Sequence, residues 1–555
     1  MSAPTEQLLN VQIDGVWHQF KKGTRMIEAC AQVGKFIPHY CYHPKLSSPG
    51  NCRMCLIEMG MPRVGPDRKP ELGPDGKPVI NWIPRPQISC AQDIAEGMGV
   101  RTDSPLVKEC RNGVMEFLLI NHPLDCPICD QAGECHLQEY SVEYGTAGSR
   151  FLEEKVKKPK RVQLGPRVTL DDERCILCSR CIRFMKEIAH DDVLGFVSRG
   201  SLTYLTAHPG RLLDSNYSLN TVDICPVGAL TSTDFRFKMR VWFLKETKSI
   251  CTSCGTGCNT IIGSRLNEIY RQTPRENNGV NSCWMCDYGR LNFHYVNLPD
   301  RLKKPQVREN QELVDSDWSH ALAIAAEQLK RFQHDQIAVV ASARMTNEEL
   351  WLARKFIDAI GTSFHDVVPH TGAADAILMS ADRNPNTLGA QLLGVTDTTP
   401  GAKLAEIATR IKSGSIKAVA AFGEDLSQIG LTSEDLRRLE ALIVVDILPN
   451  ATTRSATVLL PSSAFAEKRG SMINIKGRLQ RLNRAIQPPG SARDDWEIIR
   501  DLNQHLTGAN TIYLVEDVFK QIAEAIPDLQ GLSLSKIGDQ GIELVKESEE
   551  VPATV

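Results

Sequence analysis

Residues 175–181 read Cys-Ile-Leu-Cys-Ser-Arg-Cys, and a fourth cysteine follows in the pair Cys225-Pro226. Thiolates with the spacing C-x2-C-x2-C bind iron–sulfur clusters, which need four ligands each. Zinc sites made of four cysteines use the same ligands, so residue type alone does not separate the two. The tight run with a distant Cys-Pro is typical of iron–sulfur sites. We therefore predict a [4Fe–4S] cluster bound by Cys175, Cys178, Cys181 and Cys225.

The same stretch indicates the fold of the surrounding domain. Bacterial two-cluster ferredoxins repeat C-x2-C-x2-C-x3-C-P, and the fourth cysteine of each run binds the other cluster. Here Met185 occupies the fourth position, and hydroxyl residues occupy the cysteine positions of the second run: Ser215, Ser218 and Thr221. The region resembles a two-cluster ferredoxin that has lost one cluster. We expect these hydroxyl residues to form ordinary hydrogen bonds.

Another cysteine group, nearer the N-terminus, has a long first gap, a close pair and a distant last member. This spacing approaches the plant-type pattern C-x4-C-x2-C…C, with a longer first gap. His39 and His43 flank the first cysteine and are alternative, Rieske-like ligands, but four cysteines already satisfy a cluster. We predict a [2Fe–2S] cluster bound by Cys41, Cys52, Cys55 and Cys90.

The next group has only three clustered cysteines, Cys126, Cys129 and Cys135. A neutral imidazole can supply the fourth ligand of a [4Fe–4S] cluster. His122 precedes the trio by four residues, whereas His136 directly follows a cysteine and would reach a different iron only with difficulty. We predict His122 as the ligand, and the rival interpretation has Cys110 in that role.

The last group is Cys251-x2-Cys254-x3-Cys258-x27-Cys286. Its spacing resembles the start of molybdopterin-dependent oxidoreductases, and we predict a third [4Fe–4S] cluster there. Cys283 is an alternative to Cys286, from which it is three residues away, and the spacing favours Cys286. The remaining cysteines are expected to be small buried or partly buried residues: Cys30, Cys110 and Cys283.

All 18 cysteines of the 555-residue chain lie at or before residue 286. The N-terminal residues have no secretory signal pattern, and no apolar run reaches the roughly 18–20 residues of a spanning helix. Tight cysteine spacings therefore indicate metal binding in a reducing compartment. The formal net charge of −3 gives no sign of a nucleic-acid partner. We expect a cytoplasmic protein without direct membrane insertion.

Local patterns predict the secondary structure of the first third. Alternating residues on both sides of Asp14-Gly15 predict a β-hairpin, and Thr24 is expected to cap a helix that begins near Arg25. Strand, turn, strand, helix and cysteine loop is the opening of a plant-type ferredoxin domain. The Pro-rich stretch between Cys55 and Cys90 predicts an extended surface insertion outside the sheet. The basic run 154–161 predicts a solvated linker.

Beyond about residue 300 the pattern changes to alternating strands and helices. Apolar runs predict buried strands at 337–341, 418–422 and 442–446, and a capping box at Thr346 predicts a helix through Ile360. This alternation is typical of an α/β domain with a mostly parallel sheet. The tail from Lys546 is expected to be frayed.

Taken in order, the four groups resemble one family, the large iron–sulfur subunit (the G-subunit) of bacterial respiratory complex I, NADH–quinone oxidoreductase. The match is closest in three segments: Asn51 to Leu56, Gly195 to Arg211, and Leu213 to Leu230. It covers about residues 10–500. The resemblance supports His122 as a ligand, because the family uses the histidine at this position.

The resemblance implies a multidomain α+β and α/β fold and an electron-transfer role. Electrons would pass from NADH-reduced flavin in a partner to the [2Fe–2S] cluster, then the Cys175 set, then the His122 set, and toward quinone. The cluster of Cys251 lies off that route. The expected domains are 1–99 ([2Fe–2S] ferredoxin-like, β-grasp), 100–140 ([4Fe–4S], one histidine and three cysteines), 141–245 (degenerate ferredoxin-like), 246–302 (molybdopterin-oxidoreductase-type [4Fe–4S]) and 303–555 (molybdopterin-oxidoreductase-like α/β).

The implied partners are other peripheral-arm subunits of complex I, including the flavin- and NADH-binding subunit and the quinone-side iron–sulfur subunits. The chain would lie on the cytoplasmic side of the bacterial inner membrane, attached through these partners. No catalytic residue is expected, and no G-x-G-x-x-G follows a predicted strand to bind NADH.

Two other functions fit part of the pattern. A molybdenum-dependent, formate dehydrogenase-like enzyme would share the C-terminal domain, but residues 287–555 contain no cysteine to hold the metal. We therefore expect no molybdenum or molybdopterin and a scaffold role for that half, in which 467–470 and 477–480 resemble loops of the molybdopterin family. A zinc-bound assembly scaffold without redox chemistry is the other alternative.

Overall fold

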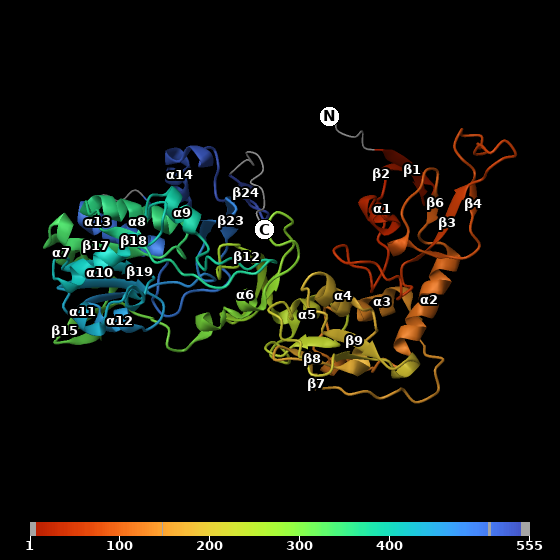
Figure 1. The fold of residues 1–555 in the computed structure, drawn as a ribbon, viewed down its shortest axis with the longest axis horizontal. Coiled ribbons are helices and arrows are strands. Elements are labelled where there is room, and N and C mark those ends of the chain that lie inside the picture. The colour runs from red at the N-terminus through yellow and green to blue at the C-terminus, as the bar shows by residue number, and fades with distance from the viewer. Residues whose placement is uncertain (1–6, 147, 509–511, 545–555) are drawn as a thin grey trace. The chain divides into compact units, whose positions relative to one another are not determined.

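The computed structural model describes residues 7–146, 148–508 and 512–544, and the predicted frayed tail from Lys546 lies outside them. The chain divides into two compact units, Met1–Trp242 and Phe243–Val555. Figure 1 shows the first unit from red to yellow and the second from green to blue. Among the described residues, no helix has both the length and the apolar character needed to cross a bilayer.

The first unit opens with the predicted hairpin. β1 (Leu8–Ile13) and β2 (Val16–Lys21) pair antiparallel, with Ile13 opposite Val16. The turn residues Asp14 and Gly15 have φ of 49° and 86°, as a two-residue turn of this kind requires. The sheet order is β2-β1-β6-β3-β4, with β5 also beside β3. The added strands are β3 (Leu56–Pro62), β4 (Ile80–Trp82), β5 (Gln87–Ile88) and β6 (Gly99–Arg101).

Two local predictions for this sheet need correction. Helix α1 (Met26–Gln32) begins one residue late, and Thr24 does not cap it, because its hydroxyl donates to the Lys21 carbonyl at 2.7 Å. The Pro-rich insertion is also not wholly outside the sheet. Its β4 segment pairs with β3, with Trp82 opposite Gly60, because this part of the insertion contains no proline to remove a ladder donor.

Two helices follow the sheet, α2 (Pro105–Leu119) and α3 (His136–Tyr144). The basic run after them is not a simple solvated linker. Lys155 donates to the carbonyls of Leu119 and Ile120 at 2.8 Å, which satisfies the C-terminal end of α2. Lys160 pairs with Asp125 at 3.1 Å. The charges of this run therefore bind it to the unit.

The rest of the first unit is the ferredoxin-like region. It contains a three-stranded sheet, β11-β8-β7, a two-stranded sheet, β10-β9, and two helices. Two of the three hydroxyl residues behave as predicted, since Ser215 accepts from the Tyr217 N–H at 3.3 Å and Thr221 donates to the Ser218 carbonyl at 2.6 Å. The elements are β7 (Val162–Gln163), β8 (Val168–Leu170), α4 (Arg180–Glu187), β9 (Leu194–Val197), β10 (Tyr204–Ala207), α5 (Asn220–Asp223) and β11 (Leu230–Ser232).

The second unit begins with an antiparallel sheet and continues into a large, mostly parallel one. The first contains β12 (Lys245–Ile250), β13 (Asn259–Arg265) and β14 (Glu268–Pro274). The second has the order β16-β15-β21-β20-β19-β17-β18, and its five strands from β21 to β18 run parallel. They are β15 (Gln306–Glu309), β16 (Glu312–Asp315), β17 (Ile337–Ala341), β18 (His365–Val367), β19 (Ala418–Phe422), β20 (Ala441–Asp446) and β21 (Val458–Pro461).

Helices cover both faces of the parallel sheet. Val339 of β17 packs in the core with α7 (Trp318–Lys330), α8 (Asn347–Ile360) and α13 (Asp495–Thr507). The next residue, Val340, packs in the opposite core with α10 (Leu404–Lys412). The predicted strands are confirmed, with β20 one residue longer, and so is the capping box at Thr346.

Candidate metal centres

The first ligand set is assembled by strand pairing. Cys55 directly precedes β3, and Cys90 follows β5, so the pairing of Leu56 with Ile88 places the two cysteines side by side. The loop after α1 brings Cys41 and Cys52 to the same place, where the Cys41 N–H lies 3.4 Å from the Cys52 sulfur. A hydrogen bond with the Cys52 thiol lowers the pKa of Cys41. The four thiols therefore gather in one group, in which Cys52 is partly buried and the other three are buried.

The second set lies between short helical segments. Cys126 begins a 3-10 turn, and Cys135 is the residue before α3. Gly228 is essential to the packing here, because a Cβ at this position would lie 2.4 Å from the Cys129 sulfur. Burial lowers the pKa of His122 to about 4, so its ring is neutral at neutral pH.

The structure places the two candidate histidines of this set differently. His122 lies within electrostatic range of Arg174, and Arg174 also interacts with Cys129. His136 instead stacks against Tyr140, with ring centroids 6.0 Å apart. The rival ligand Cys110 lies within α2.

The third set surrounds a small cavity. Cys175 follows a 3-10 turn, Cys181 lies in the first turn of α4, and Cys225 comes shortly after α5. All four cysteines line the cavity together with apolar residues such as Phe196. Burial raises the pKa of all four thiols: Cys175, Cys178, Cys181 and Cys225.

The fourth set lies in the second unit, with Cys251, Cys254 and Cys258 in the loop between β12 and β13. The Cys251 N–H donates to the Cys258 carbonyl at 2.7 Å, which closes the loop. Cys286 is the residue before α6 (Asp287–Leu291) and accepts from the Gly289 N–H at 3.3 Å. A Cβ on Gly289 would lie 2.9 Å from the Cys251 sulfur and 3.3 Å from that of Cys286. The geometry thus groups Cys286, rather than the alternative Cys283, with the other sulfurs.

Within each set the cysteines lie near one another, as their spacing predicts. Glycines leave room beside Cys129 of the second set and beside Cys251 and Cys286 of the fourth. Among the described residues, no three His, Cys, Asp or Glu side chains form a site for a single metal ion. Sequence reasoning missed the residues around the sulfurs: Arg174, Arg180, Arg183, Gly228 and Gly289. Arg180 lies within the cysteine run and Arg183 comes two residues after its last cysteine, which was a usable signal.

The second unit also has a crevice at the carboxyl ends of its parallel strands. Its lining includes Arg344 after β17, Glu424 after β19 and Asp446 at the end of β20. Burial raises the pKa of Asp446 to about 6. This is where ligands bind in open α/β sheets, at the point where the strand order reverses.

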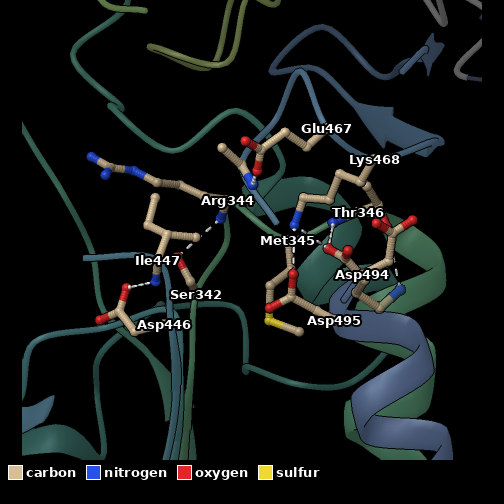
Figure 2. Close-up of polar contacts among 12 residues, drawn as sticks. Ser342, Arg344, Met345, Thr346, Asp446, Ile447, Glu467, Lys468, Asp494 and Asp495 are labelled. Atoms are coloured by element: carbon tan, nitrogen blue, oxygen red, sulfur yellow. Dashed lines mark hydrogen bonds and ion pairs between the residues drawn. The ribbon is translucent and has the colours of Figure 1, made fainter. Parts of the chain in front are cut away.

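Lys468 and Asp495 of the crevice wall belong to a group of buried ion pairs. Lys468 is 6% exposed and pairs with Glu349 at 3.0 Å and Asp495 at 2.9 Å. Figure 2 shows its ammonium group turned toward Asp495, with the Arg344 side chain extended away from it. Beside it, Glu467 pairs with Arg301 through two hydrogen bonds of 2.9 and 2.7 Å. The charges of Glu467 and Lys468 are thus paired inside the protein, whereas Arg469 pairs with Glu516 at the surface.

Family models cover most of the chain in an order that agrees with the predicted fold class. "2Fe-2S iron-sulfur cluster binding domain" matches residues 6–105, and "NADH-ubiquinone oxidoreductase-G iron-sulfur binding region" matches 111–150. "NADH-quinone oxidoreductase subunit 3, ferredoxin-like domain" matches 165–231. "NADH-ubiquinone oxidoreductase NDSU1/NuoG-like, 4Fe-4S domain" matches 244–294, and "Molybdopterin oxidoreductase" matches 301–392 and 370–505. The predicted fold class is confirmed.

Curated relatives match along most of the chain. The NADH-quinone oxidoreductase G-subunit of Rickettsia felis is 34% identical over 516 residues, which cover 90% of this chain and 72% of that protein. Its counterpart from Rickettsia typhi is 33% identical and covers 94% and 76%. The NADH-ubiquinone oxidoreductase 75 kDa subunit of Reclinomonas americana is 39% identical, covering 64% of this chain and 48% of that protein.

Proposed function

Because the chain belongs to the G-subunit family of NADH–quinone oxidoreductase, we propose that it is the electron-transfer subunit of such an oxidoreductase. It receives electrons from NADH-reduced flavin in a partner subunit and passes them toward quinone. Oxidation of NADH and reduction of quinone take place on other subunits. We assign no catalytic acid, base or nucleophile to this chain.

The proposal assigns a [2Fe–2S] cluster to the first set and a [4Fe–4S] cluster to each of the other three. When bound, these clusters supply one-electron redox chemistry. The chain's residues provide the ligands, keep water away from them and set the charge around them. The ligands are Cys41, Cys52, Cys55 and Cys90; His122, Cys126, Cys129 and Cys135; Cys175, Cys178, Cys181 and Cys225; Cys251, Cys254, Cys258 and Cys286.

The observation that carries the proposal is that the three sets of the first unit adjoin one another. Arg183 donates to the Cys41 carbonyl and interacts electrostatically with Cys178, so the first and third sets share it. Cys225 of the third set interacts with Cys135 of the second. The third set thus has a neighbour in each of the other two, which supports the proposed order of electron transfer from the first set through the third to the second.

We further propose that the partners are peripheral-arm subunits, namely the flavin- and NADH-binding subunit and the quinone-side iron–sulfur subunits. The chain then meets the membrane only through these partners, on the cytoplasmic side. The fourth set lies outside the three-set series of the first unit, and we assign it no step in the route.

The second unit is proposed to be a scaffold without molybdenum or molybdopterin. The crevice residues do not fit an anionic, phosphate-bearing cofactor. Three carboxylates line it beside Arg344, namely Glu424, Asp425 and Asp446, and the charge of Lys468 is already offset by two carboxylates. The crevice lining contains no cysteine, and its serines, such as Ser462, are weaker metal ligands than a thiolate.

Elemental analysis of the anaerobically purified chain tests these assignments. We expect roughly fourteen iron atoms per chain with matching acid-labile sulfide, and neither zinc nor molybdenum in stoichiometric amount. Stoichiometric molybdenum would support the formate dehydrogenase-like alternative. A colourless protein with zinc instead of iron would support the assembly scaffold. About ten irons would remove one [4Fe–4S] assignment, and the fourth set is the first candidate for removal.

A further inference from the structure

Two arginines of α4 lie buried beside the ligand loops of the first unit. Arg180 is 6% exposed and Arg183 is 8% exposed. Neither forms a salt bridge with a carboxylate among the residues that the structure describes. Burial of a guanidinium normally costs several kcal/mol unless an anion compensates it. The two charges therefore need an explanation.

The donors of Arg183 are directed at the first ligand loop. Its guanidinium donates to the carbonyls of Cys41 and Ser47, and its Nε donates to the Ser179 hydroxyl at 3.3 Å. These acceptors are neutral, so they satisfy the hydrogen bonds without cancelling the charge. Three acidic groups act on this guanidinium electrostatically: the sulfurs of Cys178 and Cys41, and the carboxylate of Glu187 at the end of the same helix, which forms no salt bridge with it.

The position of this charge is fixed by contacts between the loop and the helix. The Ser47 N–H donates to the Glu187 carboxylate at 2.8 Å, at the end of α4. The Asn51 amide donates to the Leu177 carbonyl at 3.2 Å, between two cysteines of the third set. Arg183 is thus held between two ligand sets by both of them.

We propose that Arg183 is a shared counter-charge for the first and third cluster sites, and that it raises the reduction potentials of both. The inference rests on the proposed cluster assignments. Reduction adds a negative charge to a cluster, and a fixed buried cation stabilises the reduced form more than the oxidised form. One residue therefore tunes two adjacent sites in the same direction.

Redox titration of the full-length chain, followed by EPR of each cluster, tests this role. In Arg183→Gln we expect the midpoint potentials of both clusters to fall by about 59 mV for a one-electron couple. At a fixed potential this corresponds to about a tenfold lower ratio of reduced to oxidised cluster. The midpoint of the His122 set should stay within error. Lys186→Gln is the matched control, because it removes an equal charge from the exposed side of the same helix, where Lys186 is 67% exposed.

Arg183→Lys separates charge from shape, since it keeps the cation but loses the planar fork. Midpoints near those of the unchanged chain are expected. Equal shifts in the lysine and glutamine variants, or no shift in the glutamine variant, would overturn the proposal. If the glutamine variant fails to assemble its clusters, their retention in the lysine variant supports the charge requirement, and their loss in both variants refutes it.

The same titration distinguishes failure of the inference from failure of the proposed function. A chain that binds no iron and shows no cluster signals before any substitution would remove the proposed function. If all the cluster signals are present but their midpoint potentials do not change when the charge at position 183 is removed, only the inference fails.

Discussion

The backbone N–H of His136 donates a hydrogen bond of 3.1 Å to the carbonyl of Pro226. This hydrogen bond joins the residue after Cys135 to the residue after Cys225, and it therefore links the second ligand set directly to the third. The bond uses only the backbone of His136. Its side chain faces Tyr140 instead.

This arrangement predicts different outcomes for the two histidines of the second set. His122→Ala should remove the cluster of that set, or convert it to a lower iron content, while His136→Ala should keep it. His122→Cys should keep the cluster and lower its potential, because a thiolate adds a negative charge where imidazole is neutral. Iron analysis and EPR redox titration check these results. An unchanged or higher potential in His122→Cys would contradict the assignment.

Gly289→Ala should damage only the fourth set. The added Cβ would press on the sulfurs of Cys251 and Cys286 at 2.9 and 3.3 Å. We expect a loss of about four irons per chain, with the EPR signals of the other clusters unchanged. Gly113→Ala is the control, because a Cβ there, on α2, meets nothing within 4 Å. A full iron content in Gly289→Ala would argue against a cluster at this site.

The sequence predicted what depends on spacing and alternation. The hairpin at Asp14-Gly15, the strand Ile337–Ala341 and the cap at Thr346 follow from local turn, strand and cap chemistry. Cysteine spacing likewise predicted groups of sulfurs that the fold brings together. These features depend on residues that are close together in the sequence, so they can be predicted without a structure.

Features that depend on distant partners cannot be read in this way. The basic run 154–161 has the composition of a solvated linker, yet Lys155 finds the end of α2 more than thirty residues away. Thr24 has the right type for a cap, but its hydroxyl prefers the carbonyl of Lys21. The role of Arg183 depends on a loop over a hundred residues earlier. Only the folded chain shows which partner a polar group selects.

Lys468→Met should destabilise the second unit by about 3–5 kcal/mol, because Glu349 and Asp495 would remain buried without a counter-charge. Lys304→Met is the matched control. Its pair with Asp315 has side chains 63% and 51% exposed, and exposed pairs contribute at most about 1 kcal/mol. Hydrogen exchange of α8 and α13 peptides in urea, on the full chain, measures the second unit separately. Equal losses in both variants would contradict the structural role of Lys468.

The buried carboxyl group of Glu348 should make the stability of the second unit depend on pH. Burial raises its pKa from 4.5 to about 7, although it accepts two hydrogen bonds of 2.8 Å from Ser471. The folded state therefore holds this proton more tightly than the unfolded state. The contribution of Glu348 to the free energy of unfolding is therefore fully present below about pH 4.5. It is lost as the pH rises toward 7, and the loss amounts to about 3 kcal/mol.

Glu348→Gln should therefore flatten the decline in stability between pH 5 and 7.5. Hydrogen exchange of α8 peptides in the full chain, corrected for intrinsic rates, measures the slope. Glu327→Gln, on the exposed face of α7, where the side chain is 66% exposed, should leave the slope unchanged. Because Glu349 and Asp446 also have raised pKa values, some decline should remain in Glu348→Gln. Protection that rises with pH in the unsubstituted chain would show that Glu348 is ionised throughout, and that its contacts with Ser471 outweigh its burial.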